Sequence, residues 1–264
     1  MDVKDRVVWI TGASSGIGEA LVYACVEAGA WVIASARRVA ELERVRAQCG
    51  ARADRVQVLP LDLAQTGTLA GLAATAVGYR GRIDVLINNG GLSQRSLAHE
   101  TPLEIDRRLM EVDYFGQVAL TKAVLPYMLA QGSGHVAVVS SITGKFGFPL
   151  RSAYAAAKHA LHGFFETLYL ELYDKGIGVT VVCPGRIQTA VSLHALGPDG
   201  RPQGVMDPGQ AKGMPARVCA DRILRAIRRR RAEVYIGGLD LIMVYLKRYL
   251  PTAFRWLARR VSAR

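Results

Sequence analysis

The stretch Thr11-Gly12-Ala13-Ser14-Ser15-Gly16-Ile17-Gly18 lies between an apolar run at residues 7–11 and an amphipathic stretch at residues 16–28. Its glycines follow the spacing GxxxGxG. Glycine allows a tight turn and lets backbone N–H groups approach an anion, and the start of a following helix carries partial positive charge. Such a turn can also simply connect a strand to a helix. At the head of a strand–helix–strand series, it predicts a dinucleotide site.

The rest of the chain continues this alternation of strand-like and helical patterns. Near-continuous apolar runs, typical of strands covered on both faces, occur at residues 7–11, 31–35, 56–60, 85–88, 135–140 and 179–183. Helical periodicity occupies residues 16–28, 39–49, 68–77, 102–130, 153–175 and 216–229, and a short strand follows at 234–236. The pattern predicts an α/β fold with one doubly wound parallel sheet, helices on both faces, and a single domain over residues 1–264.

Composition excludes several classes of protein. Of the 264 residues, 50% are hydrophobic and 21% are charged, so a mainly disordered chain is excluded. The four cysteines form no CxxC pair and have no histidine cluster beside them, so we expect no metal site and a reduced, cytoplasmic protein. The charged start runs directly into a strand, which predicts no signal peptide. No apolar run reaches the roughly 20 residues that cross a bilayer.

The end of the second strand bears on the choice of dinucleotide. A carboxylate there would accept hydrogen bonds from the ribose 2′-hydroxyl of NAD. The sequence instead gives Ala34-Ser35-Ala36 followed by Arg37 and Arg38, and guanidinium groups pair with a 2′-phosphate and stack on adenine. We therefore expect NADP(H) rather than NAD(H). The alternative for Arg38 is a solvated position at the start of a helix.

Further polar residues follow the third and fourth strands. Asp62 can accept a hydrogen bond from the adenine amino group or, alternatively, cap the next helix. Asn88-Asn89-Gly90-Gly91 closes the fourth strand. Because the ligand crevice of an open parallel sheet lies at the carboxyl ends of the strands, we expect these residues and the glycine turn at one edge.

Three residues indicate proton-transfer chemistry at the same edge. Tyr154 and Lys158 are four positions apart, so they share one face of the predicted helix. A free phenol ionises near pH ~10, and a neighbouring ammonium favours the phenolate, which suits acid–base catalysis closer to neutral pH. Ser141 ends the fifth strand and can donate a hydrogen bond to a substrate oxygen. The YxxxK spacing alone is weak evidence for a catalytic site. The interpretation as a proton-transfer site depends on its combination with the motifs at the strand ends.

Taken together, these motifs resemble the short-chain dehydrogenase/reductase family. The matching segments are 11–18, Asp62, 88–91, Ser141 with Tyr154 and Lys158, and Pro184-Gly185 through Thr189. The resemblance implies an NAD(P)-dependent oxidoreductase with a Rossmann-type sheet of about seven strands. A looser similarity of residues 206–213, 234–238 and 245–248 indicates the branch of hydroxysteroid- and retinoid-type reductases.

The resemblance also implies roles for individual residues. Tyr154 would donate or accept the proton, Lys158 would activate it and bind the ribose, and Ser141 would donate to the substrate oxygen. Ile187 and Thr189 would contact the nicotinamide carboxamide and a nearby phosphate. The full expected cofactor set is Gly12, Ser14, Ser15, Gly16, Ile17, Gly18, Arg37, Arg38, Asp62, Leu63, Asn89, Gly90, Gly91, Tyr154, Lys158, Pro184, Gly185, Ile187 and Thr189.

One position departs from the family pattern. Asp113, in Glu111-Val112-Asp113-Tyr114-Phe115-Gly116, stands where the family usually has an asparagine that holds a water linking the lysine to solvent. An ionised aspartate accepts hydrogen bonds and cannot donate them. Its charge would stabilise the Lys158 ammonium and disfavour the Tyr154 phenolate, so we place Asp113 among the catalytic residues and expect activity with a shifted pH profile. The alternative is that Asp113 only satisfies local backbone.

Positive charge is concentrated at the end of the chain. The whole chain carries +12, and residues 228–264 hold ten Lys and Arg against Glu233 and Asp240, which gives +8. In residues 241–264 apolar side chains recur at helical spacing among basic ones: Ile242, Tyr245, Leu246, Tyr249, Leu250, Phe254, Leu257 and Val261. A basic amphipathic segment of this kind can lie on an anionic membrane, or its apolar side can pack on the body or on a second subunit. No nucleic-acid motif accompanies the charge.

The long segment after the sixth strand is expected to complete the substrate site. Residues 186–213 are rich in Gly and Pro, and loops of this length in compact domains are often functional. We expect a pocket for a fairly apolar carbonyl compound, lined by Leu92, Ser93, Phe146, Phe148, Leu150 and His194. The sequence thus predicts an NADP(H)-dependent oxidoreductase acting on a carbonyl or secondary alcohol, as a homodimer or homotetramer. The alternative is a catalytically weak NADP(H)-binding protein at a membrane surface.

Overall fold

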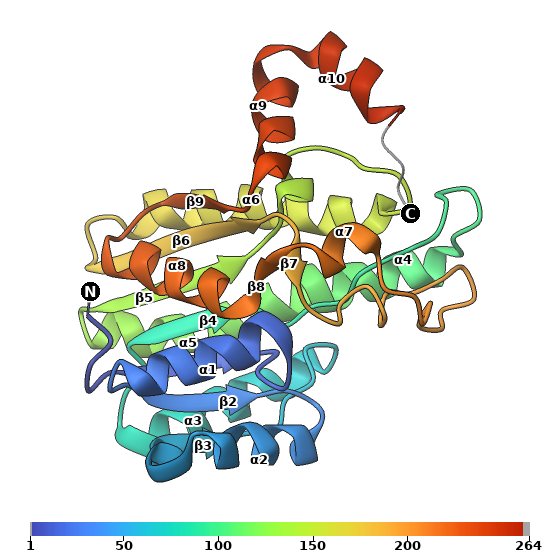
Figure 1. The fold of residues 1–264 in the computed structure, drawn as a ribbon. Coiled ribbons are helices and arrows are strands. Elements are labelled where there is room, and N and C mark those ends of the chain that lie inside the picture. The colour runs from blue at the N-terminus through green and yellow to red at the C-terminus, as the bar shows by residue number, and fades with distance from the viewer. Residues whose placement is uncertain (1, 261–264) are drawn as a thin grey trace.

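Seven parallel strands form the central sheet, in the order β3-β2-β1-β4-β5-β6-β9 (Figure 1). The structure is a computed structural model that describes residues 2–260. The strands are β1 (Val7–Thr11), β2 (Trp31–Ser35), β3 (Val56–Val58), β4 (Val85–Asn88), β5 (Gly134–Val139), β6 (Ile177–Pro184) and β9 (Glu233–Ile236). The strand order reverses between β1 and β4, which is where open sheets of this kind bind ligands. The predicted fold class is confirmed.

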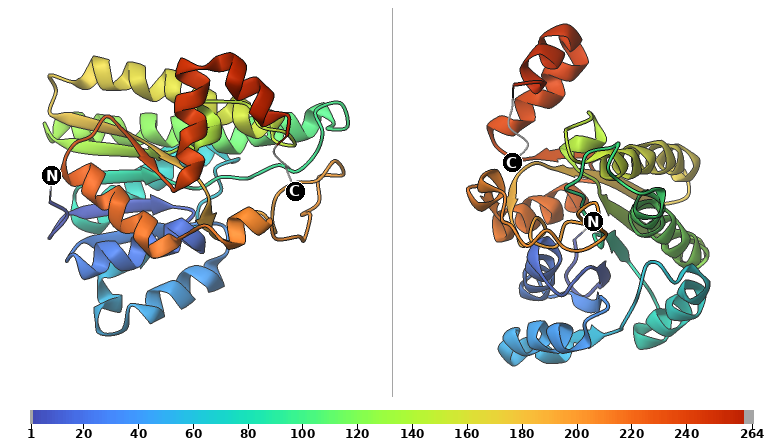
Figure 2. Two further views of the ribbon diagram at one scale, coloured as in Figure 1. Left: turned by 45° about the horizontal axis from the view of Figure 1, so that its top comes forward. Right: turned by 90° about the vertical axis from the view of Figure 1, so that its right-hand side faces the viewer.

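Helices cover both faces of the sheet (Figures 1 and 2). The helices of the described residues are α1 (Gly16–Glu27), α2 (Val39–Gln48), α3 (Leu69–Arg80), α4 (Leu103–Met110), α5 (Gly116–Ala130), α6 (Ser152–Leu172), α7 (Pro208–Ala211), α8 (Ala216–Arg228), α9 (Ile242–Tyr249) and α10 (Pro251–Ala258). Successive strand residues point to opposite faces. Val8 and Ile10 of β1 therefore pack with α1, α2 and α8, while Val7 and Trp9 pack with α3, α5 and α6.

The single helix expected over residues 102–130 is interrupted. A π-helical turn, Glu111–Phe115, separates α4 from α5. At the start of α5, a Cβ on Gly116 would lie 2.3 Å from the Leu63 carbonyl oxygen, so only glycine allows this approach. The extra residue of a π-turn does not disturb the apolar pattern enough to be read from sequence, and such turns are frequent at functional sites.

The segment after β6 is more ordered than its composition indicated. It contains a two-stranded pair, β7 (Ile187–Gln188) with β8 (Met214–Pro215), and the short helix α7. Asp207 Oδ2 lies 2.6 Å from Arg95 Nη2 and 3.0 Å from Arg151 Nη2. These ion pairs connect the segment to the residue before α6 and to the loop after β4.

Residues 239–260, which we call the C-terminal arm, extend from the body (Figures 1 and 2). The arm contains α9 and α10, which are separated by a break before Pro251. Val244 and Phe254 are its buried side chains, and they pack with Ile142 and Phe146. Val261 and the rest of the predicted amphipathic segment lie outside the described residues. Within residues 2–260, none of the helices combines the length and apolarity needed to cross a membrane.

Candidate active site

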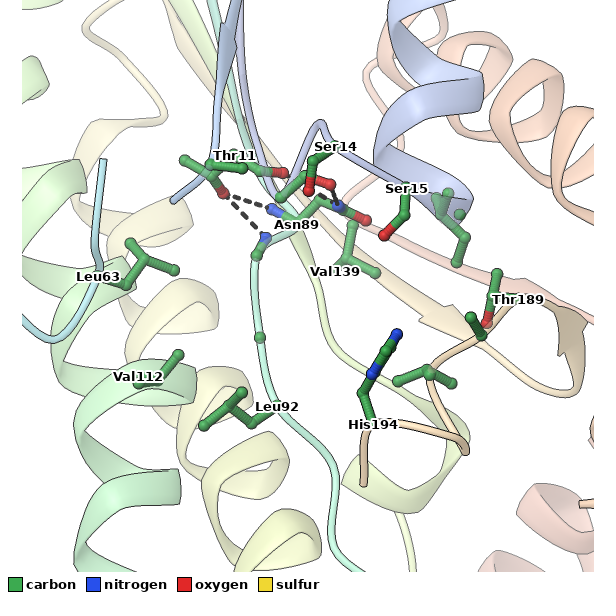
Figure 3. Close-up of a pocket in the computed structure, with 18 of the residues that line it drawn as sticks. Thr11, Ser14, Ser15, Leu63, Asn89, Leu92, Val112, Val139, Thr189 and His194 are labelled. Carbon is green, nitrogen blue, oxygen red and sulfur yellow. Dashed lines mark hydrogen bonds between the residues drawn. The ribbon is translucent and has the colours of Figure 1, made fainter. Parts of the chain in front are cut away.

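A cavity of about 500 Å³ opens at the carboxyl ends of the strands (Figure 3). It brings together most of the residues singled out from the sequence: Gly12, Ser14, Ser15, Gly16, Ile17, Arg37, Arg38, Asp62, Leu63, Asn89, Gly90, Gly91, Ser141, Tyr154, Lys158, Pro184, Gly185, Ile187 and Thr189. Gly18 and Asp113 do not line it and lie behind its wall. Parallel strands that end at one edge account for this convergence of distant segments.

The glycine turn brings the start of α1 to the cavity. Gly16 has φ +61°, a left-handed conformation that other residues rarely adopt. A Cβ on Gly18 would lie 2.1 Å from the Gly12 carbonyl oxygen, so glycine is required there for packing. The free N–H groups at the start of α1 and its partial positive charge suit a pyrophosphate. The residues present are therefore compatible with a dinucleotide.

Thr11 joins the ends of β1 and β4, as the dashed lines of Figure 3 show. Its hydroxyl oxygen accepts hydrogen bonds from the backbone N–H of Asn89 at 3.0 Å and of Gly90 at 2.9 Å. The Asn89 side chain donates in return to the Thr11 carbonyl at 3.0 Å. Sequence reasoning assigned Thr11 only to the glycine motif, because its partner lies 78 positions away.

Two arginines and one aspartate occupy the far end of the cavity. Arg37 and Arg38 are both exposed, and Arg38 Nη2 donates to Ser14 Oγ at 3.2 Å. Asp62 Oδ1 accepts from the backbone N–H of Ala64 at 3.0 Å. The cap of α3 is Thr68, so the helix-cap alternative for Asp62 is wrong. This end combines a positively charged rim with one carboxylate.

Tyr154 and Lys158 lie on α6, and Ser141 follows β5 across the cavity. Lys158 is 4% exposed, its Nζ donates to the Val139 carbonyl at 3.1 Å, and it lies 5.6 Å from the Tyr154 ring centroid. Ser141 Oγ accepts from Thr143 Oγ1 at 3.0 Å and lies 3.4 Å from the Pro184 carbonyl oxygen. A fixed ammonium beside a phenol, opposite a hydroxyl, is an arrangement suited to proton transfer.

Asp113 is fully buried in the π-helical turn, directly behind Lys158. Its Oδ1 accepts from the backbone N–H of Leu92 at 2.6 Å, and its Oδ2 lies 3.4 Å from Lys158 Nζ. Burial raises the pKa of Asp113, although the Lys158 charge and the Leu92 hydrogen bond act in the opposite direction. Asp113 therefore accepts a hydrogen bond from the backbone, which was the alternative role expected from the sequence, and it also contacts Lys158.

The remaining wall of the cavity is mostly apolar. Figure 3 shows Leu92, Val112 and His194 around its lower part, with Val139 above them near Asn89. Sequence reasoning missed several lining residues on other segments: Val112, Arg108, Ala190, Val191, Leu196, Gly200, Pro202 and Gln210. Phe146 and Phe148, expected here, pack instead beneath the C-terminal arm. Ser93 and Leu150 also lie outside the cavity lining.

A group of possible metal ligands surrounds His162, one turn beyond Lys158 on α6. His162, Cys183 and Glu233 have ligand atoms within 4.8 Å of one another. Lys145 Nζ lies 2.5 Å from Glu233 Oε1, so an ammonium already neutralises this carboxylate. Burial and the nearby Glu233 charge raise the pKa of the Cys183 thiol well above its usual range. This donor set suits an ion-pair network better than a metal ion.

The fold and this cavity define an oxidoreductase of the Rossmann type, and comparisons with known proteins identify its family. The family model for short chain dehydrogenases matches residues 6–195. A dehydrogenase/reductase SDR family protein 7-like from Drosophila melanogaster is 42% identical over 257 residues, which cover 96% of this chain and 79% of the relative. The chain therefore belongs to the short-chain dehydrogenase/reductase family.

Solved structures agree with this assignment. A short chain dehydrogenase from Burkholderia cenocepacia, in complex with NADP, has a TM-score of 0.81 at 26% identity and covers 98% of this chain and 99% of its own. A short chain dehydrogenase/reductase from Burkholderia phymatum, in complex with NAD, has a TM-score of 0.84 at 22% identity, with 94% of each chain covered. The second similarity establishes the fold alone.

Proposed function

We propose that the protein is an NADP(H)-dependent oxidoreductase that interconverts a carbonyl and a secondary alcohol on a small molecule with an apolar body. The observation that carries this proposal is the presence of Ser141, Tyr154 and Lys158 in one cavity with the glycine turn. The apolar side chains at the other end of the cavity, such as Leu92 and Val112, support an apolar substrate.

The chain's own residues account for binding and proton transfer. The start of α1 would hold the pyrophosphate, and Lys158 the nicotinamide ribose. Bound nicotinamide supplies or accepts the hydride. In reduction, the Ser141 hydroxyl donates a hydrogen bond to the substrate oxygen, and the Tyr154 hydroxyl transfers its proton to that oxygen as negative charge grows there. The Lys158 ammonium, held by the Val139 carbonyl, stabilises the resulting phenolate.

The preference for NADP(H) rests on the end of β2. No carboxylate follows Ser35 there, and Arg37 and Arg38 line the cavity. The related structures carry NADP in one case and NAD in another, which supports a nicotinamide cofactor without choosing between the two. We expect Arg37→Ala/Arg38→Ala to weaken NADPH binding by roughly 1–3 kcal/mol, the size of charge-assisted hydrogen bonds, and to leave NADH binding nearly unchanged.

The test is a panel of ketones and aldehydes with NADPH or NADH, followed by the absorbance of the reduced cofactor. Turnover with NADPH on an apolar ketone is expected. The alternative function, a binding protein with weak catalysis, predicts that NADPH binds while every carbonyl compound remains unreduced. That outcome would contradict the enzyme proposal.

Oligomeric state and location are also proposals. Leu129 of α5, Leu170 of α6 and the adjacent Tyr173 are exposed, and these apolar side chains support a contact between copies in a homodimer or homotetramer. Sedimentation velocity on the purified chain tests this, with a monomer as the contradicting result. The four cysteines are free thiols, which supports a reducing, cytoplasmic environment.

A further inference from the structure

We infer that the C-terminal arm, residues 239–260, docks on a membrane surface that contains anionic lipids. The inference is independent of catalysis, because none of the residues that line the active-site cavity belongs to the arm. It rests on three observations: the attachment of the arm to the body, its exposed apolar side chains and its charge.

The arm is attached along one side only. Val244 and Phe254 pack with Ile142 and Phe146, and the Phe146 and Phe254 ring centroids lie 5.3 Å apart in an edge-on contact. Figure 1 and the right-hand view of Figure 2 show α9 and α10 projecting beyond the layers of the body. The attachment therefore fixes which side of the arm faces outward.

Large apolar side chains remain exposed on the arm. They are Leu239 at 85%, Ile242 at 51%, Tyr245 at 53%, Tyr249 at 73%, Leu250 at 58% and Trp256 at 59% exposure. Large apolar side chains exposed together on one short segment are typical of sites that contact proteins or membranes. Tyr and Trp in particular favour the boundary between lipid headgroups and hydrocarbon, because one end of each ring is polar.

The charge of the arm selects between possible occupants. Arg248, Arg255, Arg259 and Arg260 are exposed, and Lys247 is half-buried. The single acid of the arm, Asp240, accepts hydrogen bonds from the backbone N–H groups of Arg186 and Gly238. A second copy of this chain would bring the same cations and a net charge of +12 to the contact. An anionic lipid surface instead attracts each cation near it.

Length and amphipathicity define the mode of binding. α9 and α10 each have 8 residues and meet at Pro251, so the arm would lie in the interface and not span the bilayer. The guanidinium of Arg260 stacks 3.6 Å from the Trp256 ring centroid, which places a cation and an aromatic ring at one point of the arm. The basic side chains would then contact headgroups while the rings enter the boundary layer.

The experiment is co-sedimentation of the full chain with vesicles of phosphatidylcholine alone or mixed with phosphatidylglycerol. We expect binding to the anionic vesicles that weakens at high salt. Arg255→Gln/Arg259→Gln/Arg260→Gln should lower the affinity by about one hundred-fold, and Ile242→Ser/Tyr249→Ser/Leu250→Ser should abolish binding. Leu103→Ser, at a side chain 55% exposed on α4, is the matched control and should bind like the parent chain.

A second measurement needs no disruptive variant. Vesicles with brominated lipid tails should quench the fluorescence of Trp256 as its ring enters the lipid. The signal would report on this residue, because Trp9 is fully buried and Arg80 covers the ring of Trp31 at 3.3 Å. Trp256→Phe should remove the quenching. Absence of vesicle binding by the parent chain overturns the inference, as does equal binding to neutral vesicles or unchanged binding by both arm variants. Loss of a dimer in the arm variants, without vesicle binding by the parent, would identify a second copy as the occupant.

Discussion

The nucleotide end of the cavity and its substrate end are held in place by different means. The nucleotide end consists of strand ends and tight turns, joined by backbone contacts such as those of Thr11 with Asn89 and Gly90. The substrate end depends on the segment after β6, which two ion pairs of Asp207 attach to the body. Changes at the first end should therefore lower both stability and cofactor affinity. Changes at the second end should weaken substrate binding and leave cofactor affinity unchanged.

The largest effect is expected where the two ends meet, at Tyr154. Tyr154→Phe removes the proton donor and leaves the ring in place, so turnover should fall by roughly 10²–10⁴-fold. NADPH affinity should remain nearly unchanged, because the nucleotide end is intact. Single-turnover kinetics and fluorescence titration measure the two quantities. Retained turnover would show that another group supplies the proton.

Gly18→Ala tests the nucleotide end. The added Cβ would lie 2.1 Å from the Gly12 carbonyl oxygen and 2.6 Å from Asn89 Nδ2, so overpacking should cost up to about 3 kcal/mol of unfolding free energy. NADPH affinity should fall with it. Gly71→Ala, in α3 with open space around it, is the matched control and should stabilise the protein by about 0.5–1 kcal/mol. Equal effects of the two variants in thermal unfolding would contradict the packing argument.

Asp207→Asn tests the substrate end. Burial alone would raise the pKa of Asp207, but the hydrogen bond and charge of Arg95, with the charge of Arg151, lower it overall. A lowered folded-state pKa means that the stabilisation is complete above the ordinary pKa of aspartate and is lost as pH falls through the folded value. The variant should thus lose about 1.5 kcal/mol at neutral pH and approach the parent chain in acid.

The same variant should separate the two ends kinetically. KM for the carbonyl substrate should rise several-fold, because the segment is less firmly held, while the Kd for NADPH should stay constant. Urea unfolding at several pH values and steady-state kinetics provide the measurements. A rise in the Kd for NADPH would show that the two ends are not independent.

The smallest effect concerns Asp113. Because burial raises its pKa, its contribution to stability is present at low pH and is lost as pH rises through the folded value. Asp113→Asn should therefore gain stability relative to the parent chain at high pH. Without this negative charge the Tyr154 phenolate forms more readily, so the pH profile of alcohol oxidation should move to lower pH. If the parent chain and the variant have the same pH profile, the role of Asp113 is limited to its hydrogen bond with the backbone of Leu92.

The same contrast determines what could be predicted from sequence. The strands, the glycine turn and the residues at the nucleotide end follow from short motifs, because strand ends in a parallel sheet necessarily meet. The hydrogen bonds between Thr11 and Asn89 join residues far apart in the sequence, so a local pattern does not predict them. The π-turn at Asp113 adds a single residue to a helical turn, which local periodicity does not reveal. The substrate wall, including Val112 and Leu196, comes from segments without a motif. The C-terminal arm was predicted as amphipathic, but its attachment at Phe254 to Phe146 was not.

The position of Arg151 has a consequence for engineering this scaffold. Arg151 binds Asp207 and is followed directly by Ser152, the first residue of the helix that carries Tyr154. The substrate segment between β7 and α7 is therefore anchored at α7 and can vary in length at its tip around Gly200 without loosening that helix. Loop grafting between residues 197 and 204 would change the size of the cavity, while the ion pair of Arg151 with Asp207 and the position of Tyr154 are retained.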